Sequence, residues 1–186
     1  MVAKTSTMQA LGTSSHGFTL ADVCTNASIS LSTEVKKPVL LMFICNHCPF
    51  VLHVMNELTA LANQAQRDGF FVAAISSNDI ERYPQDSPEE MILFAKNYGF
   101  KFPYLYDESQ SIAKSYDAVC TPDFFVYDDT HKLVYRGQMD DSRPNSSIPV
   151  TGNELRTALT AILNGAKPPL NQRPSIGCSI KWKTES

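Results

Sequence analysis

Two unbroken apolar runs, separated by a stretch with helical periodicity, dominate the first half of the chain. The first, Val39 to Ile44, is too short to cross a membrane and has the length of a strand buried on both faces of a sheet. Apolar residues then recur at helical spacing from Pro49 to Gln66, and proline is favoured at the first position of a helix. The second run extends from Phe70 to Ile75. Strand, helix and strand in this order predict two parallel strands joined by a right-handed crossover.

Shorter elements are predicted on both sides of this unit. Phe18 to Val23 and Ile29 to Leu31 have the pattern of a short hairpin. Ser87-Pro88-Glu89-Glu90 is a capping box with proline at the first helical position, which predicts a helix over 88–98. The later elements that we expect are an extended segment at 102–107, a short helix at 109–116, an antiparallel hairpin of 124–127 and 133–136, and a helix that Asn153 caps and that ends near Leu163.

The size and composition fit one globular domain with an appendage at each end. The chain has 186 residues, of which 43% are hydrophobic, enough to bury a single core. We expect residues 1–17 to be a flexible lead-in and residues 18–165 to form the domain. Residues 166–186 are rich in proline and lack a helical period, so we expect an extended strap packed on the domain.

The charge pattern and the cysteine count bear on partners and location. The net charge is −3 and no basic run is present, so we expect no nucleic-acid partner. The polar N-terminus lacks the apolar core of a signal peptide, and no later stretch has the ~20 apolar residues of a membrane span. Five irregularly spaced cysteines argue against a secreted disulfide framework and favour thiols in a reducing compartment. We therefore expect a cytoplasmic protein with no membrane partner.

Cys45 and Cys48 stand where the first predicted strand gives way to the helix. The first turn of a helix has unpaired N–H groups and a partial positive charge, which favour a thiolate. Cysteines of C-x-x-C motifs at such positions have pKa values lowered from ~8.5 to roughly 3.5–7.5, and the thiolate is the form that attacks a disulfide or a peroxide. The two-residue spacing lets the second sulfur resolve a mixed disulfide. Thiol-disulfide chemistry is therefore the favoured interpretation.

Two other interpretations of the cysteine pair remain open. A C-x-x-C motif can be half of a zinc site, but such a site needs a second pair of ligands, and the sequence has no second cluster with that spacing. A purely structural pair is the other alternative. The favoured interpretation requires neither a metal nor another cofactor, and we expect none.

The order of the predicted elements, with a Thr-Pro sequence ahead of the last hairpin and a closing helix, resembles the thioredoxin fold. From Leu11 to Trp182 the chain resembles a family of thioredoxin-like proteins in the redoxin branch, which includes peroxiredoxins and TlpA-like proteins. The motifs that carry this resemblance are C-N-H-C-P-F-V at 45–51, T-P-D-F-F at 121–125, R-G-Q-x-D-D-S-R-P at 136–144 and P-S-I-G-C-S-I-K-W at 174–182. The resemblance implies an α/β thioredoxin-like fold, with a mixed central sheet flanked by helices in three layers, an N-terminal hairpin and an extended C-terminal tail.

The resemblance also implies roles for individual residues. Cys45 matches the exposed nucleophilic cysteine and Cys48 the resolving one. Thr121-Pro122 matches the loop whose proline is cis and whose preceding backbone pairs with a bound substrate. Val39 stands where thioredoxins carry a buried acid, so we expect no buried carboxylate near the cysteines. Neither cysteine is preceded by the full P-x-x-x-[ST]-x-x pattern with which peroxiredoxins hold a peroxide.

His47 lies between the two cysteines, as the histidine does in the C-P-H-C motif of the oxidant DsbA. A histidine beside a helix-start thiolate lowers its pKa and makes the disulfide easier to reduce. We therefore hypothesise a pair more oxidising than that of thioredoxin; the alternative is a solvated histidine without such a role. His47 and His53 could also bind copper together with the cysteines, as in Sco-type proteins, but those use C-x-x-x-C, and the spacing here argues against it.

Three accessory candidates lie outside the motif. Cys120 precedes the Thr-Pro loop and could lie close to Cys45. Cys178 could act as a distant resolving or regulatory thiol if the strap folds back over the mouth of the sheet. Arg136 could stabilise a thiolate or a peroxide oxygen. The plainer interpretations are packed, inert cysteines and charges paired within a loop. We expect Cys24, near a hairpin turn, to be an idle, partly exposed thiol.

The sequence thus predicts a thiol-disulfide oxidoreductase in which Cys45 attacks and Cys48 releases the reduced product. Its expected partners are a protein disulfide or a peroxide as substrate and an upstream thiol reductant. One alternative is a peroxiredoxin-like peroxide reductase with an antioxidant role. An alternative of another class is a copper- or zinc-binding thiol module or carrier.

Overall fold

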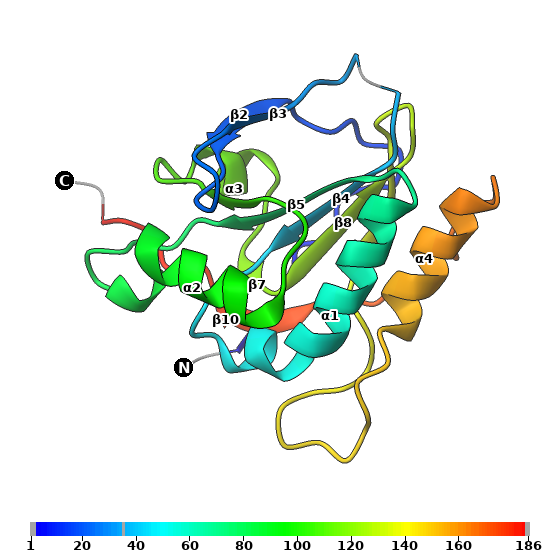
Figure 1. Ribbon diagram of the computed structural model, residues 1–186. Helices are drawn as coiled ribbons and strands as arrows, with labels where there is room; N and C mark the ends of the chain where they lie inside the picture. The colour runs from blue at the N-terminus through cyan, green and yellow to red at the C-terminus, as the bar shows by residue number, and fades with distance from the viewer. Residues whose placement is uncertain (1–2, 35, 185–186) are drawn as a thin grey trace.

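A mixed five-stranded sheet forms the centre of the molecule (Figure 1). The structure, a computed structural model, describes residues 3–34 and 36–184. The strand order is β6-β5-β4-β8-β9, with β4 in the middle. Parallel pairing joins β4 to β5 and β5 to β6, whereas β8 pairs antiparallel with both β4 and β9. The bounds are β4 Val39–Phe43, β5 Phe71–Ser76, β6 Tyr104–Tyr106, β8 Asp123–Tyr127 and β9 Leu133–Gly137. The predicted mixed sheet of a thioredoxin-like fold is confirmed.

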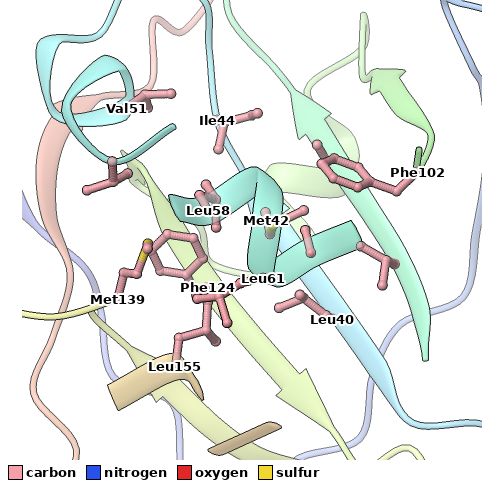
Figure 2. Packing of buried hydrophobic residues seen from close by; sticks show 14 of the residues in the cluster. Leu40, Met42, Ile44, Val51, Leu58, Leu61, Phe102, Phe124, Met139 and Leu155 are labelled. Carbon is pink, nitrogen blue, oxygen red and sulfur yellow. The ribbon is translucent and has the colours of Figure 1, made fainter. Parts of the chain in front are cut away.

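The two faces of the sheet bury alternate residues of its strands. Leu40 and Met42 of β4 point to the face covered by helices α1 (Pro49–Arg67), α2 (Pro88–Tyr98) and α4 (Asn153–Leu163), as the core around Leu58 and Leu155 in Figure 2 shows. Val39, Leu41 and Phe43 point to the opposite face. That face is covered by the short helix α3 (Ser111–Ser115) and by the antiparallel hairpin β2 (Phe18–Ala21) and β3 (Ser28–Leu31). The core therefore consists of two layers of apolar side chains, one on each face of the sheet.

The helix starts follow the local sequence signals, with one difference. Cys48 is the N-cap residue of α1 and Pro49 its first residue. Ser87 caps α2 by accepting a hydrogen bond from the backbone N–H of Glu90, as the capping box predicts. At α4 the N-cap is Gly152 rather than Asn153. Gly152 has a φ of 62°, and a Cβ there would lie 2.5 Å from Leu61 Cδ1, so close packing against α1 selects glycine at this position.

A second, three-stranded sheet joins the two ends of the chain to the domain. It has the order β1-β10-β7 and is antiparallel throughout, with β1 at Ala3–Thr5, β7 at Cys120–Thr121 and β10 at Ile176–Ser179. Residues 3–5 are therefore held in a sheet, where the sequence suggested a flexible lead-in. The pairing places the tail against the strand that leads into Pro122, beside the N-terminal end of α1 (Figure 1). Among the described residues, no helix is long and apolar enough to span a membrane.

Candidate active site

Three cysteine sulfurs from three separate segments meet at the start of α1. Cys45 lies just after β4, Cys48 caps α1, and Cys178 comes from β10. The side chain of Cys48 is hydrogen-bonded to Cys45 on one side and to Cys178 on the other. Cys48 is therefore the middle sulfur of the three. The tail thus folds back and brings Cys178 to the C-x-x-C pair, which is the arrangement on which the suggested role of Cys178 depends.

Cys48 is the sulfur on which the hydrogen-bond donors converge. The thiol of Cys45 donates to it, as do the thiol and backbone N–H of Cys178 and the backbone N–H of Val51 in the first turn of α1. These donors lower the pKa of Cys48 to about 5, although burial works in the opposite direction. In its thiol form Cys48 instead donates to the backbone oxygen of Thr121, 3.2 Å away. The helix start thus stabilises an anion, as expected, but on the second sulfur of the motif.

Cys45 is not exposed, which corrects the expectation from the resemblance. Its residue exposure is 1%, close to the 0% of Cys48. The hydrogen bond to Cys48, burial and the nearby charge of Asp86 raise the pKa of Cys45 well above its ordinary value, whereas the Thr121 hydroxyl, 3.4 Å from the sulfur, opposes this. The enclosure comes from segments that pack on the cysteine loop: the cis-proline loop on one side and the segment that carries Asp86 on the other.

The peptide bond between Thr121 and Pro122 is cis, as the resemblance implies. Thr121 contacts both cysteines of the motif, with its hydroxyl at Cys45 and its carbonyl oxygen at Cys48. Its backbone is not free for a substrate, however, because Thr121 pairs with Cys178 of β10. The chain's own tail therefore occupies the edge on which the resemblance would place a substrate.

Asp86 is a fully buried carboxylate beside the cysteine loop, where the sequence suggested that none would be found. It ends the 3-10 helix η1 (Pro84–Asp86) and accepts hydrogen bonds from the backbone N–H of Asn46 at 2.8 Å and from Asn78 Nδ2 at 2.7 Å. Its second oxygen also lies 2.7 Å from His47 Nδ1. The carboxylate thus holds the two residues between the cysteines in place. Only the folded loop brings Asp86 here, since it lies about 40 positions from the motif and nothing in its local sequence marks it.

His47 is oriented by Asp86 and by an aromatic neighbour. Its Nδ1–H donates to Asp86, and its ring stacks on Tyr83 with 5.6 Å between ring centroids and 6° between planes. The side chain is 16% exposed, so it reaches solvent while the two flanking cysteines are buried. The partner of the imidazole Nδ1–H is therefore the carboxylate of Asp86 and not a cysteine sulfur. The donors that stabilise a thiolate are therefore backbone and thiol groups, not the imidazole of the hypothesis.

The accessory candidates divide into one that joins the site and two that do not. Cys178 joins it. Cys120 is buried with its thiol 4.0 Å from the backbone oxygen of Pro122, and burial raises its pKa, so it is not part of the hydrogen-bonded sulfurs. Arg136 is fully buried, pairs with Asp123 at 3.3 Å and lies over the Phe125 ring, so it is a structural cation and not a ligand for a thiolate or peroxide. Cys24 is exposed, as expected.

One group of side chains has the composition of a metal site. Ligand atoms of Cys45, His47 and Asp86 lie within 4.8 Å of one another. The 2.7 Å contact between His47 and Asp86 is a hydrogen bond, and the carboxylate already accepts two others. Binding a metal would therefore require breaking contacts that fix the loop. His53, the other histidine of the copper hypothesis, donates or accepts at Ser142 Oγ instead, 2.7 Å away.

Comparisons with known proteins agree with this architecture. Two solved structures are similar over nearly the whole chain. An uncharacterized conserved protein from Geobacillus kaustophilus is 52% identical, with a TM-score of 0.95 over 100% of this chain and 99% of that one. A hypothetical protein from Sinorhizobium meliloti is 42% identical, with a TM-score of 0.93 over 97% of this chain and 99% of that one. A secreted disulfide oxidoreductase of Mycobacterium tuberculosis, described as homologous to Escherichia coli DsbE, is 19% identical with a TM-score of 0.60 over 77% of this chain and 95% of that one, and shows the shared thioredoxin-like fold alone.

None of the curated proteins compared with the chain matches it. The model of the AhpC/TSA family matches residues 11–136, which is more than half of the chain and includes β4, the cysteine pair, the segment with Asp86 and the cis-proline loop. The chain therefore belongs to the AhpC/TSA family, a family of thioredoxin-like redoxins.

Proposed function

We propose that this protein is a thiol-disulfide oxidoreductase whose working pair is Cys45 and Cys48. The observation that carries the proposal is the hydrogen bond between the two sulfurs at the start of α1, where the backbone N–H of Val51 and Cys178 also point at Cys48. Two thiols joined in this way lose their first proton as a pair, and the resulting charge is shared along the S–H···S bond. A dithiol with one easily removed proton is the reactive form in thiol-disulfide exchange.

Cys45 is the sulfur that attacks the substrate, because it is the outer one of the pair. It lies next to the partly exposed His47, whereas Cys48 lies between Cys45 and the buried Cys178. Since Cys45 is enclosed, attack requires a local opening of the loop at Asn46 and His47. Transfer of the shared proton to Cys48 then leaves the thiolate on Cys45.

The reaction follows the usual two exchange steps. The Cys45 thiolate attacks one sulfur of a substrate disulfide, which forms a mixed disulfide and releases the other substrate sulfur as a thiolate that takes up a proton. The Cys48 thiolate then attacks Cys45 Sγ, forms the Cys45–Cys48 disulfide and releases the second substrate thiol. An upstream dithiol reductant reverses the chemistry on the protein, most simply in a reducing compartment such as the cytoplasm.

Thr121 and Asp86 act on these steps as positioning residues. The Thr121 hydroxyl stabilises negative charge on Cys45, whereas Asp86 fixes Asn46 and His47 and opposes that charge. The balance of the two sets how readily Cys45 ionises once the loop opens.

Trapping tests the proposal. Cys48→Ser removes the resolving sulfur, so that a substrate disulfide should accumulate as a mixed disulfide on Cys45, detected by mass spectrometry after incubation with a disulfide such as oxidised glutathione or insulin. Cys24→Ser, which removes the exposed cysteine, is the matched control and should reduce insulin at the wild-type rate. Absence of an adduct on Cys45 in Cys48→Ser, or insulin reduction that survives Cys45→Ser, would refute the proposal.

The same preparations separate the two alternatives. Rapid peroxide consumption without disulfide exchange would make the protein a peroxide reductase. Stoichiometric copper or zinc in the purified protein, lost on Cys45→Ser, would make it a metal-binding module.

A further inference from the structure

We propose that Cys178 is a third redox-active cysteine, which forms a disulfide with Cys48 and thereby releases Cys45 from the oxidised pair. The inference rests on the proposed function and extends it from two thiols to three. It is carried by the position of β10, by the order of the sulfurs and by their burial.

The backbone of β10 fixes Cys178 against the cysteine pair. Cys178 lies directly opposite Thr121 in the antiparallel pairing of β10 with β7, and Thr121 in turn contacts both Cys45 and Cys48. β10 is also paired on its other edge, with Ala3 of β1 opposite Cys178. A strand held on both edges has a well-defined register. Cys178 is therefore placed at the pair by the fold and does not reach it as part of a loose tail.

Gly177 allows this close approach. A Cβ at this position would lie 1.9 Å from the backbone oxygen of Thr121 and 2.6 Å from its carbonyl carbon, far inside any permitted contact. Only glycine lets β10 lie so near the cis-proline loop. The neighbouring cysteine is consequently brought within hydrogen-bond contact of Cys48.

The order of the sulfurs makes Cys48 the common partner. Cys48 contacts both Cys45 and Cys178, so it is the sulfur that the other two share. All three cysteines are buried, at 1%, 0% and 2% exposure for Cys45, Cys48 and Cys178. Once two of these cysteines form a disulfide, the third can exchange with it without entry of solvent or of a further molecule. The middle sulfur is the one that a nucleophile can attack from either side.

The exchange itself needs no added oxidant or reductant. Starting from the Cys45–Cys48 disulfide, Cys178 loses its proton and its sulfur attacks Cys48 Sγ. The Cys48–Cys178 bond forms as the Cys45–Cys48 bond breaks, Cys45 leaves with the electron pair, and the proton passes to it. One disulfide and one thiol are present before and after, so the step is an isomerisation.

The protonation state of Cys178 suits this sequence. In the reduced protein, burial and the neighbouring Cys48 raise its pKa to about 12, while Lys181 opposes the shift, so Cys178 serves as a hydrogen-bond donor and not as a competing nucleophile. When Cys48 is part of a disulfide it carries no negative charge, and the contribution of Cys48 to that raised pKa disappears. Cys178 therefore gains nucleophilic character only after the pair has been oxidised.

The Cys45→Ser variant tests the inference directly. It retains four of the five cysteines, and with excess oxidised glutathione we expect Cys48 and Cys178 to form an intramolecular disulfide, while the exposed Cys24 takes a glutathione adduct and the buried Cys120 keeps its free thiol. Thiol titration of the denatured protein gives the count, and mass spectrometry of a non-reducing digest identifies the linked peptides.

Two double variants provide matched controls. Cys45→Ser/Cys178→Ser should stop at a glutathione adduct on Cys48. Cys45→Ser/Cys120→Ser removes a cysteine from β7, the strand paired with β10, and should still form the Cys48–Cys178 disulfide. If Cys45→Ser keeps Cys178 free, either with a stable adduct on Cys48 or with no reaction, the inference is wrong. The trapping of Cys45 in Cys48→Ser does not depend on Cys178, so failure of the proposed function is recognised separately.

Discussion

Two fully buried aspartates, Asp86 beside the cysteine loop and Asp123 in β8, are stabilised in different ways. Asp86 accepts hydrogen bonds from a backbone N–H, an asparagine amide and an imidazole. Asp123, just after the cis-proline, pairs with one cation, Arg136 at 3.3 Å, and also interacts with the backbone N–H of Phe124, but its Oδ1 lacks a side-chain hydrogen-bond partner among the described residues. Burial raises the pKa of Asp123 to about 7 despite the adjacent guanidinium.

The partners of the two carboxylates indicate different roles: Asp86 orders the candidate site, whereas Asp123 stabilises the fold. The donors of Asp86 come from the cysteine loop itself and from Asn78, just after β5, so its carboxylate orders the segment that must move for Cys45 to react. Asp123 and Arg136 join β8 to β9, and Arg136 also binds Thr7 Oγ1 and the backbone oxygen of Asp117. We therefore expect changes at the ion pair to alter stability, and changes at Asp86 to alter both stability and thiol reactivity.

Arg136→Met should have the largest effect on stability. It leaves the Asp123 carboxylate buried without its cation, and removal of one partner of a buried pair typically costs about 3–5 kcal/mol. The free energy of unfolding from urea titration at pH 8, where an unpaired Asp123 is hardest to accommodate, measures the loss. A loss below ~1 kcal/mol would mean that the pair does not hold β8 to β9.

The double variant Asp123→Asn/Arg136→Met completes this test. Since it removes both charges, it should be more stable than Arg136→Met alone, and the cycle gives the coupling free energy of the pair. Thiol-disulfide exchange should proceed at the wild-type rate in every variant of the cycle that remains folded.

The pH dependence of stability should show the raised pKa of Asp123. Its pKa rises from 3.8 to about 7 on folding, mainly through burial, so between these values the native state binds more protons than the unfolded state. The contribution of this group is fully present below pH ~4 and is lost as the pH rises through about 7, with a slope of up to ~1.4 kcal/mol per pH unit. Urea titrations from pH 4 to pH 8 measure the slope, and Asp123→Asn should flatten it. An unchanged slope in Asp123→Asn would assign the pH dependence to other groups.

The elements of the central domain could be predicted from sequence because each has a local cause. The apolar run of β4, the period of α1 with Pro49 at its start and the Ser87 cap of α2 are signals within a few residues of where they act. The cysteine pair at the helix start could be placed for the same reason.

The parts of the site that were missed depend on contacts between distant segments. β1, β7 and β10 have two to four residues each and pair positions as far apart as Ala3 and Cys178, and strands so short have no readable alternation. Asp86 reaches the cysteine loop only through the fold of η1. The enclosure of Cys45 follows from these same long-range contacts, and so the expected exposure of its sulfur was wrong.

Asp86→Asn should have the smallest effect on stability of these variants. It should lower the free energy of unfolding but raise the reactivity of Cys45. The amide keeps the shape but turns one acceptor into a donor facing its former partners, so we expect a loss of about 1–3 kcal/mol in the free energy of unfolding. Removing the negative charge also removes one cause of the raised pKa of Cys45 and loosens the loop, so Cys45 should be alkylated faster and at lower pH. Rates of iodoacetamide labelling of Cys45 as a function of pH, followed by mass spectrometry, measure the shift.

Asp107→Asn is the matched control. Asp107 is equally buried but accepts hydrogen bonds from Ser77 and from the N–H of Ala113 in α3. Its loss should therefore lower the free energy of unfolding by a similar amount and leave the labelling profile of Cys45 unchanged. Slower labelling in Asp86→Asn, or equal acceleration in both variants, would show that the carboxylate does not act on Cys45 through its charge.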